Sequence, residues 1–237
     1  MKEKITHPLC DGTGIYKPKG EVKYVAFTAS FLWRLIDRDW ATKHGILYGK
    51  NTTEAWLMRK KLPYLDFLDW DVWEATKNAE KTRDRHMWIV KEFRPSIVMG
   101  PDIFYDDNDR TIKKKLEYVD KLMCCASRVV VPVHRWHKRL EDYEIAFPGG
   151  VYGPKNNFFI WELQDHVTHI LGGTPKKQKY FKMFFPRCIS VDGNSILRQA
   201  MKFGKILTED GNWEQKDWGL NEIFKKSVEN LIKFWGL

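Results

Sequence analysis

Residues 167–204 read VTHILGGTPKKQKYFKMFFPRCISVDGNSILRQAMKFG, and this is the most informative stretch of the chain. It begins with an apolar run, Val167–Leu171, that predicts a buried strand. The run ends in the turn sequence GGTP at 172–175, after which Pro175–Phe184 is expected to form a helix because threonine and proline are typical of a helix start. The first half of the stretch therefore predicts one strand–turn–helix unit.

The second half repeats the same order of elements. A second apolar run, Cys188–Val191, predicts a strand that stops at Asp192. The chain then turns at Gly193 into a helix that carries Arg198. Two consecutive strand–helix units of this kind are typical of parallel α/β folds.

The same alternation extends outward through the chain. Helical segments are predicted at Thr52–Lys61, Trp73–Phe93, Arg110–Cys125 and Pro175–Phe184. Eight apolar runs predict strands at Tyr24–Ser30, Gly45–Gly49, Tyr64–Leu68, Ser96–Asp102, Arg128–His134, Tyr143–Phe147, Val167–Leu171 and Cys188–Val191. At 237 residues, this pattern predicts a (β/α)8 barrel of the TIM type over residues 1–204. Residues 205–237 are expected to form a C-terminal extension whose amphipathic helix, Leu220–Trp235, packs on the barrel.

Composition limits the class of protein. The 40 Lys and Arg residues exceed the 31 Asp and Glu residues, which gives a formal charge of +9 and favours a nucleic-acid partner. The four cysteines form no CxxC pair, so the sequence predicts neither a zinc ribbon nor a disulfide framework. Because the chain has no apolar signal core and no run of 18 apolar residues, we expect a cytoplasmic protein without a membrane partner.

Acidic residues end several of the predicted strands, where a barrel of this type builds its active site. Asp192 ends the eighth strand, Asp102 ends the fourth, and Asp66 and Asp69 lie around the end of the third. A carboxylate there could stabilise or bond to an oxocarbenium-like sugar carbon while a second carboxyl moves protons. The same acids would suit a divalent metal, and a metal-dependent hydrolase is therefore an alternative.

The order of these motifs resembles the queuine-type tRNA-guanine transglycosylases over roughly residues 60–204. That family carries a strand, Gly-x-Gly-x-Pro, a helix, and a strand ending in the nucleophilic Asp with Arg shortly after; here these are GGTP at 172–175, Asp192 and Arg198. Gly149 and Gly150 match the family's Gly-Gly segment on the sixth strand. The family's Gln on the fifth strand is absent, and His134 stands at or next to its position.

Two further departures point to one branch of the family. The zinc-binding insertion is missing, and the sequence LDFLDWDVW replaces the segment that holds the general base. The chain is therefore similar to the paralogues of bacteria and bacteriophages that insert 7-deazaguanines into DNA. That resemblance implies a transglycosylase that replaces guanine in DNA with a free 7-deazaguanine base and needs no cofactor or metal.

The resemblance also implies the roles of individual residues. Asp192 would be the nucleophile, and Asp66 or Asp69 the general base. Substrate contacts are implied for Asp102, His134, Gly149, Gly150, Gly172, Gly173 and Arg198. The same exchange on tRNA and a non-catalytic nucleic-acid-binding barrel remain alternatives, and the sequence does not predict the oligomeric state.

Overall fold

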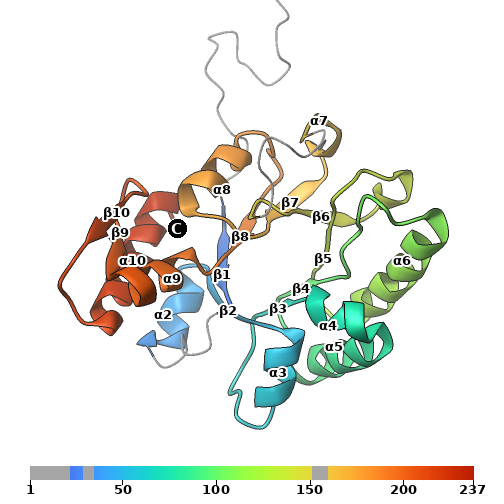
Figure 1. Ribbon diagram of the computed structural model, residues 1–237, viewed down its shortest axis with the longest axis horizontal. Coiled ribbons are helices and arrows are strands. Elements are labelled where there is room, and N and C mark those ends of the chain that lie inside the picture. The colour runs from blue at the N-terminus through green and yellow to red at the C-terminus, as the bar shows by residue number, and fades with distance from the viewer. Residues whose placement is uncertain (1–21, 29–34, 151–159) are drawn as a thin grey trace, which may run out of the picture.

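In the computed structural model, strands β1 to β8 form one closed parallel barrel (Figure 1). The structure describes residues 22–28, 35–150 and 160–237. Neighbouring strands in the chain are neighbours in the barrel, and β8 closes it by pairing in parallel with β1. The strands are β1 (Tyr24–Phe27), β2 (Ile46–Asn51), β3 (Phe67–Asp69), β4 (Ile97–Met99), β5 (Val129–Pro132), β6 (Glu144–Phe147), β7 (Val167–Ile170) and β8 (Ser190–Asp192). The predicted (β/α)8 fold is confirmed.

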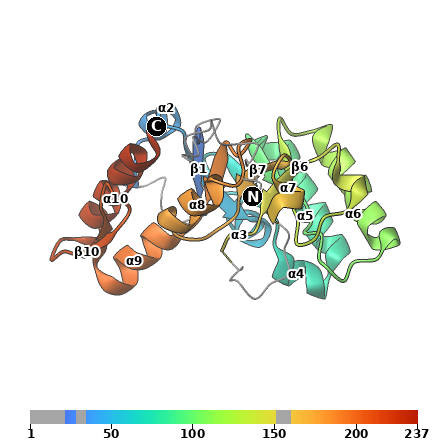
Figure 2. The ribbon, with the colours of Figure 1, turned by 90° about the horizontal axis from the view of Figure 1, so that it is seen from above.

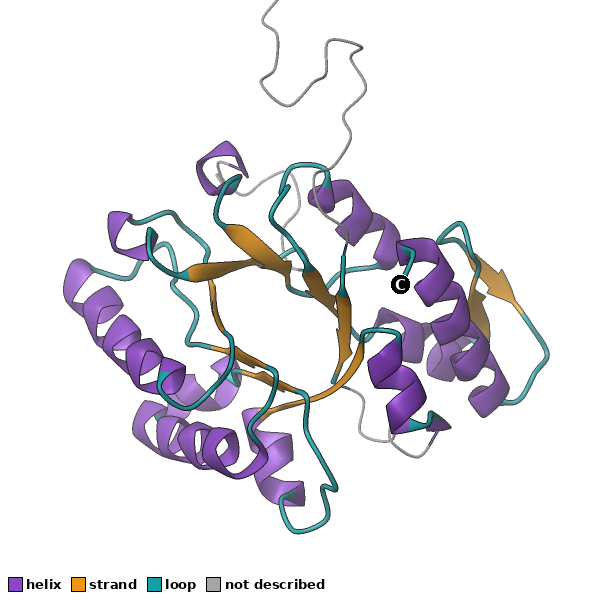
Figure 3. Ribbon diagram, turned by 180° about the vertical axis from the view of Figure 1, so that it is seen from behind, coloured by secondary structure: helices purple, strands orange, loops and turns teal. Residues whose placement is uncertain are grey.

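Helices surround this ring of strands on the outside (Figure 3). Most of them follow a strand directly, as expected for repeated βα units. They are α2 (Arg38–Lys43), α3 (Thr52–Met58), α4 (Val72–Lys77), α5 (Ala79–Phe93), α6 (Asp109–Met123), α7 (Ile160–Leu163), α8 (Pro175–Lys182) and α9 (Ser195–Phe203). Within the described ranges, no helix is both long enough and apolar enough to cross a membrane.

Short polar side chains fix where the helices begin. The Asn51 side chain accepts the backbone N–H of Glu54 at 2.8 Å and starts α3 directly after β2. Thr174 caps α8 in the same way, with Pro175 as the first helical residue. These caps turn the chain sharply at the carboxyl ends of the strands, which is the face where a barrel of this type carries its site.

Most predicted boundaries differ from the structure by a few residues, as at β3, which was expected at Tyr64–Leu68 and spans Phe67–Asp69; two differences have a clear cause or bear on the site. The single helix expected at Trp73–Phe93 is divided into α4 and α5, because the Asn78 side chain accepts the N–H of Lys81 at 3.0 Å and starts a new helix there. The eighth strand was predicted at Cys188–Val191 but spans Ser190–Asp192. The last two residues of the first predicted strand, Tyr24–Ser30, lie outside the described residues.

Small residues make room for rings inside the barrel. Gly49 of β2 is paired with Phe67 of β3, and a Cβ added to Gly49 would lie 2.6 Å from the Phe67 ring. The Phe67 ring stacks on His169 of β7, with centroids 5.8 Å apart and an angle of 17° between the planes. Phe67 and His169 therefore point into the barrel, which fixes the inward face of β3 and β7.

The C-terminal extension packs on the outside of the barrel (Figure 2). It contains an antiparallel pair, β9 (Lys205–Leu207) and β10 (Trp213–Gln215), followed by α10 (Leu220–Trp235). Phe224 of α10 meets Phe27 of β1 edge to face, with ring centroids 6.4 Å apart. The extension is therefore continuous with the barrel's hydrophobic core.

Candidate active site

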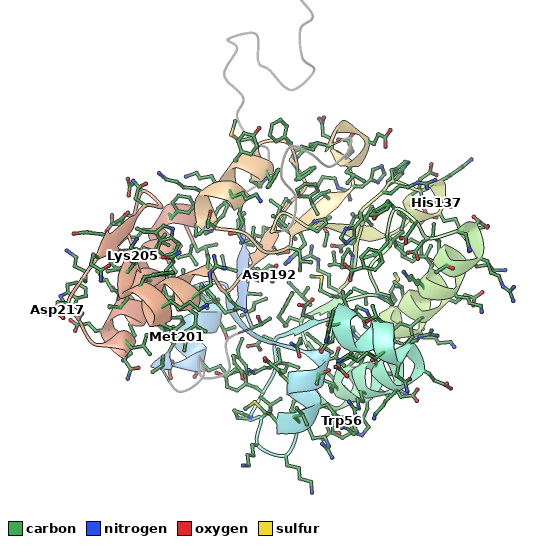
Figure 4. All side chains as sticks on the ribbon, in the orientation of Figure 1. Trp56, His137, Asp192, Met201, Lys205 and Asp217 are labelled. Carbon is green, nitrogen blue, oxygen red and sulfur yellow. The ribbon has the colours of Figure 1, made fainter. Side chains whose placement is uncertain are left out.

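Asp192 lies at the carboxyl end of β8, beside Ala26 of β1 in the parallel pairing. Its Oδ1 accepts the backbone N–H of Gly172 at 2.8 Å and lies 3.3 Å from Nε2 of His169. Among the described residues, no hydrogen-bond donor reaches Oδ2. The carboxylate is thus anchored through one oxygen, at the barrel wall near β1 (Figure 4).

The glycines after β6 and β7 bring two loops into direct contact. Gly172 and Gly173 have φ angles of 69° and 95°, a conformation that favours glycine. A Cβ added to Gly172 would lie 3.2 Å from Cα of Gly150, so the two backbones touch. Gly149 instead packs against Ile170 and Phe181. The contact between Gly172 and Gly150 holds the Gly172 N–H against Asp192.

Gln178 of α8 locks the same two residues from the other side, a role that the sequence did not reveal. Its buried amide donates to the backbone carbonyl of Asp192 at 2.6 Å and to that of Gly172 at 3.1 Å. Because Gln178 stands among lysines in a polar helix, no local pattern separates it from the solvated residues around it. The side chain of Gln178 reaches the end of β8 only because α8 packs beside that strand in the folded chain.

Asp69 ends β3 and shares the inward face with Phe67, two residues before it. Burial raises the pKa of Asp69 well above its usual value of 3.8, and the nearby carboxylates of Asp192 and Asp102 raise it further. Three of the predicted acids, from the ends of β3, β4 and β8, are therefore close enough to act on one another. Asp69 therefore holds a proton more readily than an ordinary exposed carboxyl does.

Asp66, the other candidate for the general base, is not part of this group. It precedes β3, where its carboxylate lies 3.3 Å from Nη2 of Arg38 and 3.3 Å from the backbone nitrogen of Tyr48. Arg38 in turn stacks over the ring of Tyr64 at 4.0 Å. Asp66 thus links the start of β3 to α2, whereas Asp69 lies near Asp192.

Asp102 and His134 form a second buried pair in the loops after β4 and β5. Oδ1 of Asp102 lies 3.0 Å from Nε2 of His134. Nζ of Lys115 donates to the backbone carbonyl of Asp102 at 2.7 Å and holds this loop on α6. A carboxylate and an imidazole are thus held together after β4 and β5.

The exposure of Arg198 and of three aromatic residues, Trp70, Trp73 and Tyr105, differs widely. Arg198 is exposed on α9. Trp70 is buried between His86 and Tyr118 in the core. Trp73 on α4 and Tyr105 after β4 are 73% and 71% exposed.

A column of polar side chains lies beneath Asp192 inside the barrel, and sequence reasoning missed it. It runs from Glu144 through Arg128 and Ser190 to His169. These residues come from four different strand regions, β5 to β8. A histidine inside the apolar run of β7 was the one local signal that this part of the core is polar.

The fold and these inward-facing acids define a (β/α)8 barrel with carboxylates gathered at one end of its strands. The chain belongs to a family of unknown function, DUF6610, whose model matches residues 41–236. No curated protein matches the sequence. In the part of the chain that the structure describes, no group of three or more His, Cys, Asp or Glu side chains is arranged to hold a metal ion.

Proposed function

We propose that this protein is a base-exchange transglycosylase that replaces guanine in DNA with a 7-deazaguanine derivative through a covalent Asp192–sugar intermediate. One observation carries the proposal. Asp192 is a carboxylate anchored by two donors on one oxygen, and Asp69 beside it has a pKa raised by burial and by that same carboxylate. Paired carboxyls in different environments are how enzymes that cleave glycosidic bonds divide nucleophile and acid.

In the first step, Oδ2 of Asp192 attacks C1′ of the target nucleotide while the bond to guanine breaks. The proton on Asp69 passes to the departing purine, which leaves as a neutral base. The sugar remains bound to Asp192 as an ester, and Asp69 is left as a carboxylate. Charge and protons balance without an external reagent.

In the second step, the 7-deazaguanine occupies the vacated position. Its N9–H gives the proton to the Asp69 carboxylate, and N9 attacks C1′ and expels Asp192. Two inversions at C1′ retain the β-anomer. Both carboxyls return to their starting states, because the proton that Asp69 gives to guanine is replaced by the one it takes from the 7-deazaguanine.

The substrate class rests on charge, on the resemblance and on the second pair. A net charge of +9 favours a polyanion, whose binding should weaken steeply with salt. A guanine in a duplex must be flipped out to reach a barrel mouth. We assign Asp102 and His134 to reading its polar edge, since a carboxylate accepts from N1–H and the exocyclic amine of guanine.

The experiment is a base-exchange assay run in parallel on DNA and on tRNA. Each nucleic acid carries labelled guanine, and free 7-deazaguanine is supplied. We expect release of label from DNA by the wild-type protein, none by Asp192→Asn, and equal nucleic-acid binding by both. Asp109→Asn, an exposed acid paired with Arg139, is the matched control and should exchange normally. Release from tRNA alone would move the proposal to tRNA, and release by Asp192→Asn would refute the nucleophile.

A further inference from the structure

The polar column under Asp192 is continuous from the floor of the barrel to its mouth. Nε of Arg128 donates to Glu144 at 2.6 Å, and Nη1 of Arg128 donates to Oγ of Ser190 at 2.9 Å. Oγ of Ser190 lies 2.8 Å from Nδ1 of His169, whose Nε2 lies 3.3 Å from Oδ1 of Asp192. Ser190 and His169 are almost fully buried. Each member thus touches the next through one defined atom.

The donors and acceptors in this column can be assigned from its base upward. A guanidinium has only donors, so Ser190 must accept from Arg128 and keeps its own proton to give. The carbonyl of Thr168 already accepts from Arg128 and from the N–H of Ile189, and it lies farther from Oγ of Ser190, at 3.3 Å. The serine proton therefore goes to Nδ1 of His169.

This assignment decides the state of His169. With Nδ1 accepting, the ring proton sits on Nε2 and points at Asp192. Burial lowers the pKa of His169 and outweighs the hydrogen bond and the charge of Asp192, which raise it, so the ring stays neutral. A neutral donor holds a carboxylate in place without cancelling its charge.

We propose that His169 is a positioning residue for Asp192. Ser190 and Arg128 hold it as the Nε2–H tautomer, and it joins Gly172 in fixing Oδ1 so that Oδ2 is the reacting oxygen. The reaction itself rests on the proposed function. The tautomer and the fixing of the carboxylate do not, and they can be measured on the folded protein alone.

The first test is nitrogen NMR of the full-length protein labelled at histidine. The His169 resonances are assigned by their loss in His169→Gln. We expect wild-type His169 to appear as a single Nε2–H tautomer, and Ser190→Ala, which removes the donor to Nδ1, to give a mixture of tautomers. An Nδ1–H tautomer in the wild type, or an unchanged signal in Ser190→Ala, would overturn the proposal.

The second test separates positioning from packing. His169→Gln keeps an N–H near the place of Nε2, whereas His169→Leu keeps bulk and removes the donor. We expect faster hydrogen exchange of the Gly172 amide in His169→Leu, because Asp192 is then held by one donor, and near-normal protection in His169→Gln. Equal Gly172 protection in the wild type and both variants would overturn the proposal.

Base exchange gives a third and separable readout. If the wild type is active, kcat should fall about 10- to 100-fold in His169→Leu, with substantial rescue in His169→Gln. A wild type that exchanges no base on DNA or tRNA would end the proposed function, and the two NMR measurements would still decide the role of His169. An active protein whose kcat is unchanged in His169→Leu would refute positioning.

Discussion

The backbone N–H of Gly172 donates to Oδ1 of Asp192 over 2.8 Å, and this bond ties the loop after β7 to the last residue of β8. It exists because Gly172 adopts a φ of 69° and touches Gly150 in the neighbouring loop. The orientation of the proposed nucleophile therefore depends on the backbone conformation of two loops, the one after β7 and the one after β6 that it touches. Changes to that backbone should alter Asp192 without removing any acidic group.

Gly172→Ala tests this dependence. An L-residue at this positive φ costs about 1–2 kcal/mol, and the new Cβ crowds Gly150. We expect a loss of that size in the free energy of unfolding, measured with urea, together with strongly reduced base exchange. Gly204→Ala is the matched control, since Gly204 has a φ of 56° at the end of α9 and lies away from the acids. It should lose similar stability and keep its exchange activity; equal activity in the two variants would contradict the role of Gly172.

Asp69→Asn should make the protein more stable and its base exchange slower. The carboxyl's raised pKa means that the folded protein keeps this proton above pH 3.8 while the unfolded chain releases it. Wild-type stability therefore falls, relative to the variant, as pH rises from about 4 through the raised pKa of Asp69. We expect Asp69→Asn to be more stable than the wild type at neutral pH, equal to it below about pH 4, and slower in exchange by about 10²–10⁴-fold. Urea titrations at several pH values provide the measurement, and a variant that is less stable at neutral pH would argue against a strained carboxyl.

Asp66→Asn provides the contrast between the two acids of the third strand region. It removes an ion pair with Arg38, whose side chain is half exposed, so the expected cost is about 0–1 kcal/mol. Because Asp66 lies outside the group of Asp69, Asp102 and Asp192, base exchange should remain at the wild-type rate. Abolished exchange in Asp66→Asn with normal exchange in Asp69→Asn would reverse the assignment.

His86 predicts an acid-sensitive core. It is buried, lies 2.6 Å from Oγ1 of Thr52 through Nδ1, and has its pKa lowered by burial from 6.5 to about 3. Below pH 6.5 the unfolded chain takes up a proton that the folded chain refuses, so the wild type should lose up to about 1.4 kcal/mol of stability per pH unit down to about pH 3. His86→Phe should flatten this dependence in urea titrations between pH 7 and about pH 4. Parallel slopes for the two proteins would show that another group is responsible.

Much of the fold could be predicted because its signals are local. Apolar runs such as Val129–Pro132 are buried on both faces of the barrel wall, and this gives them a composition that polar helices lack. The helix boundary at Asn78 was not predicted because it depends on a side-chain cap. The start of β8 at Ser190 was not predicted because it depends on pairing with β1. Neither effect is visible in hydrophobic periodicity.

The site was predictable only in part, for a similar reason. Asp192, Asp102 and Asp69 follow apolar runs, and a strand end in this fold is a site position. The choice between Asp66 and Asp69 needs the phase of alternation, which the pairing of Phe67 with Gly49 sets. The column from Glu144 to His169 joins residues distant in sequence, so no local pattern could identify it.

The seam between β1 and β8 has a consequence for how the protein is made. Ala26 lies beside Asp192 in that pairing, and the Thr28 backbone donates to the Asn194 side chain just beyond it. The barrel closes only when β8, far along the chain, pairs with β1. Until that pairing forms, Asp192 lacks its neighbour Ala26, so a chain without β1 would keep the proposed nucleophile but lose the strand beside it.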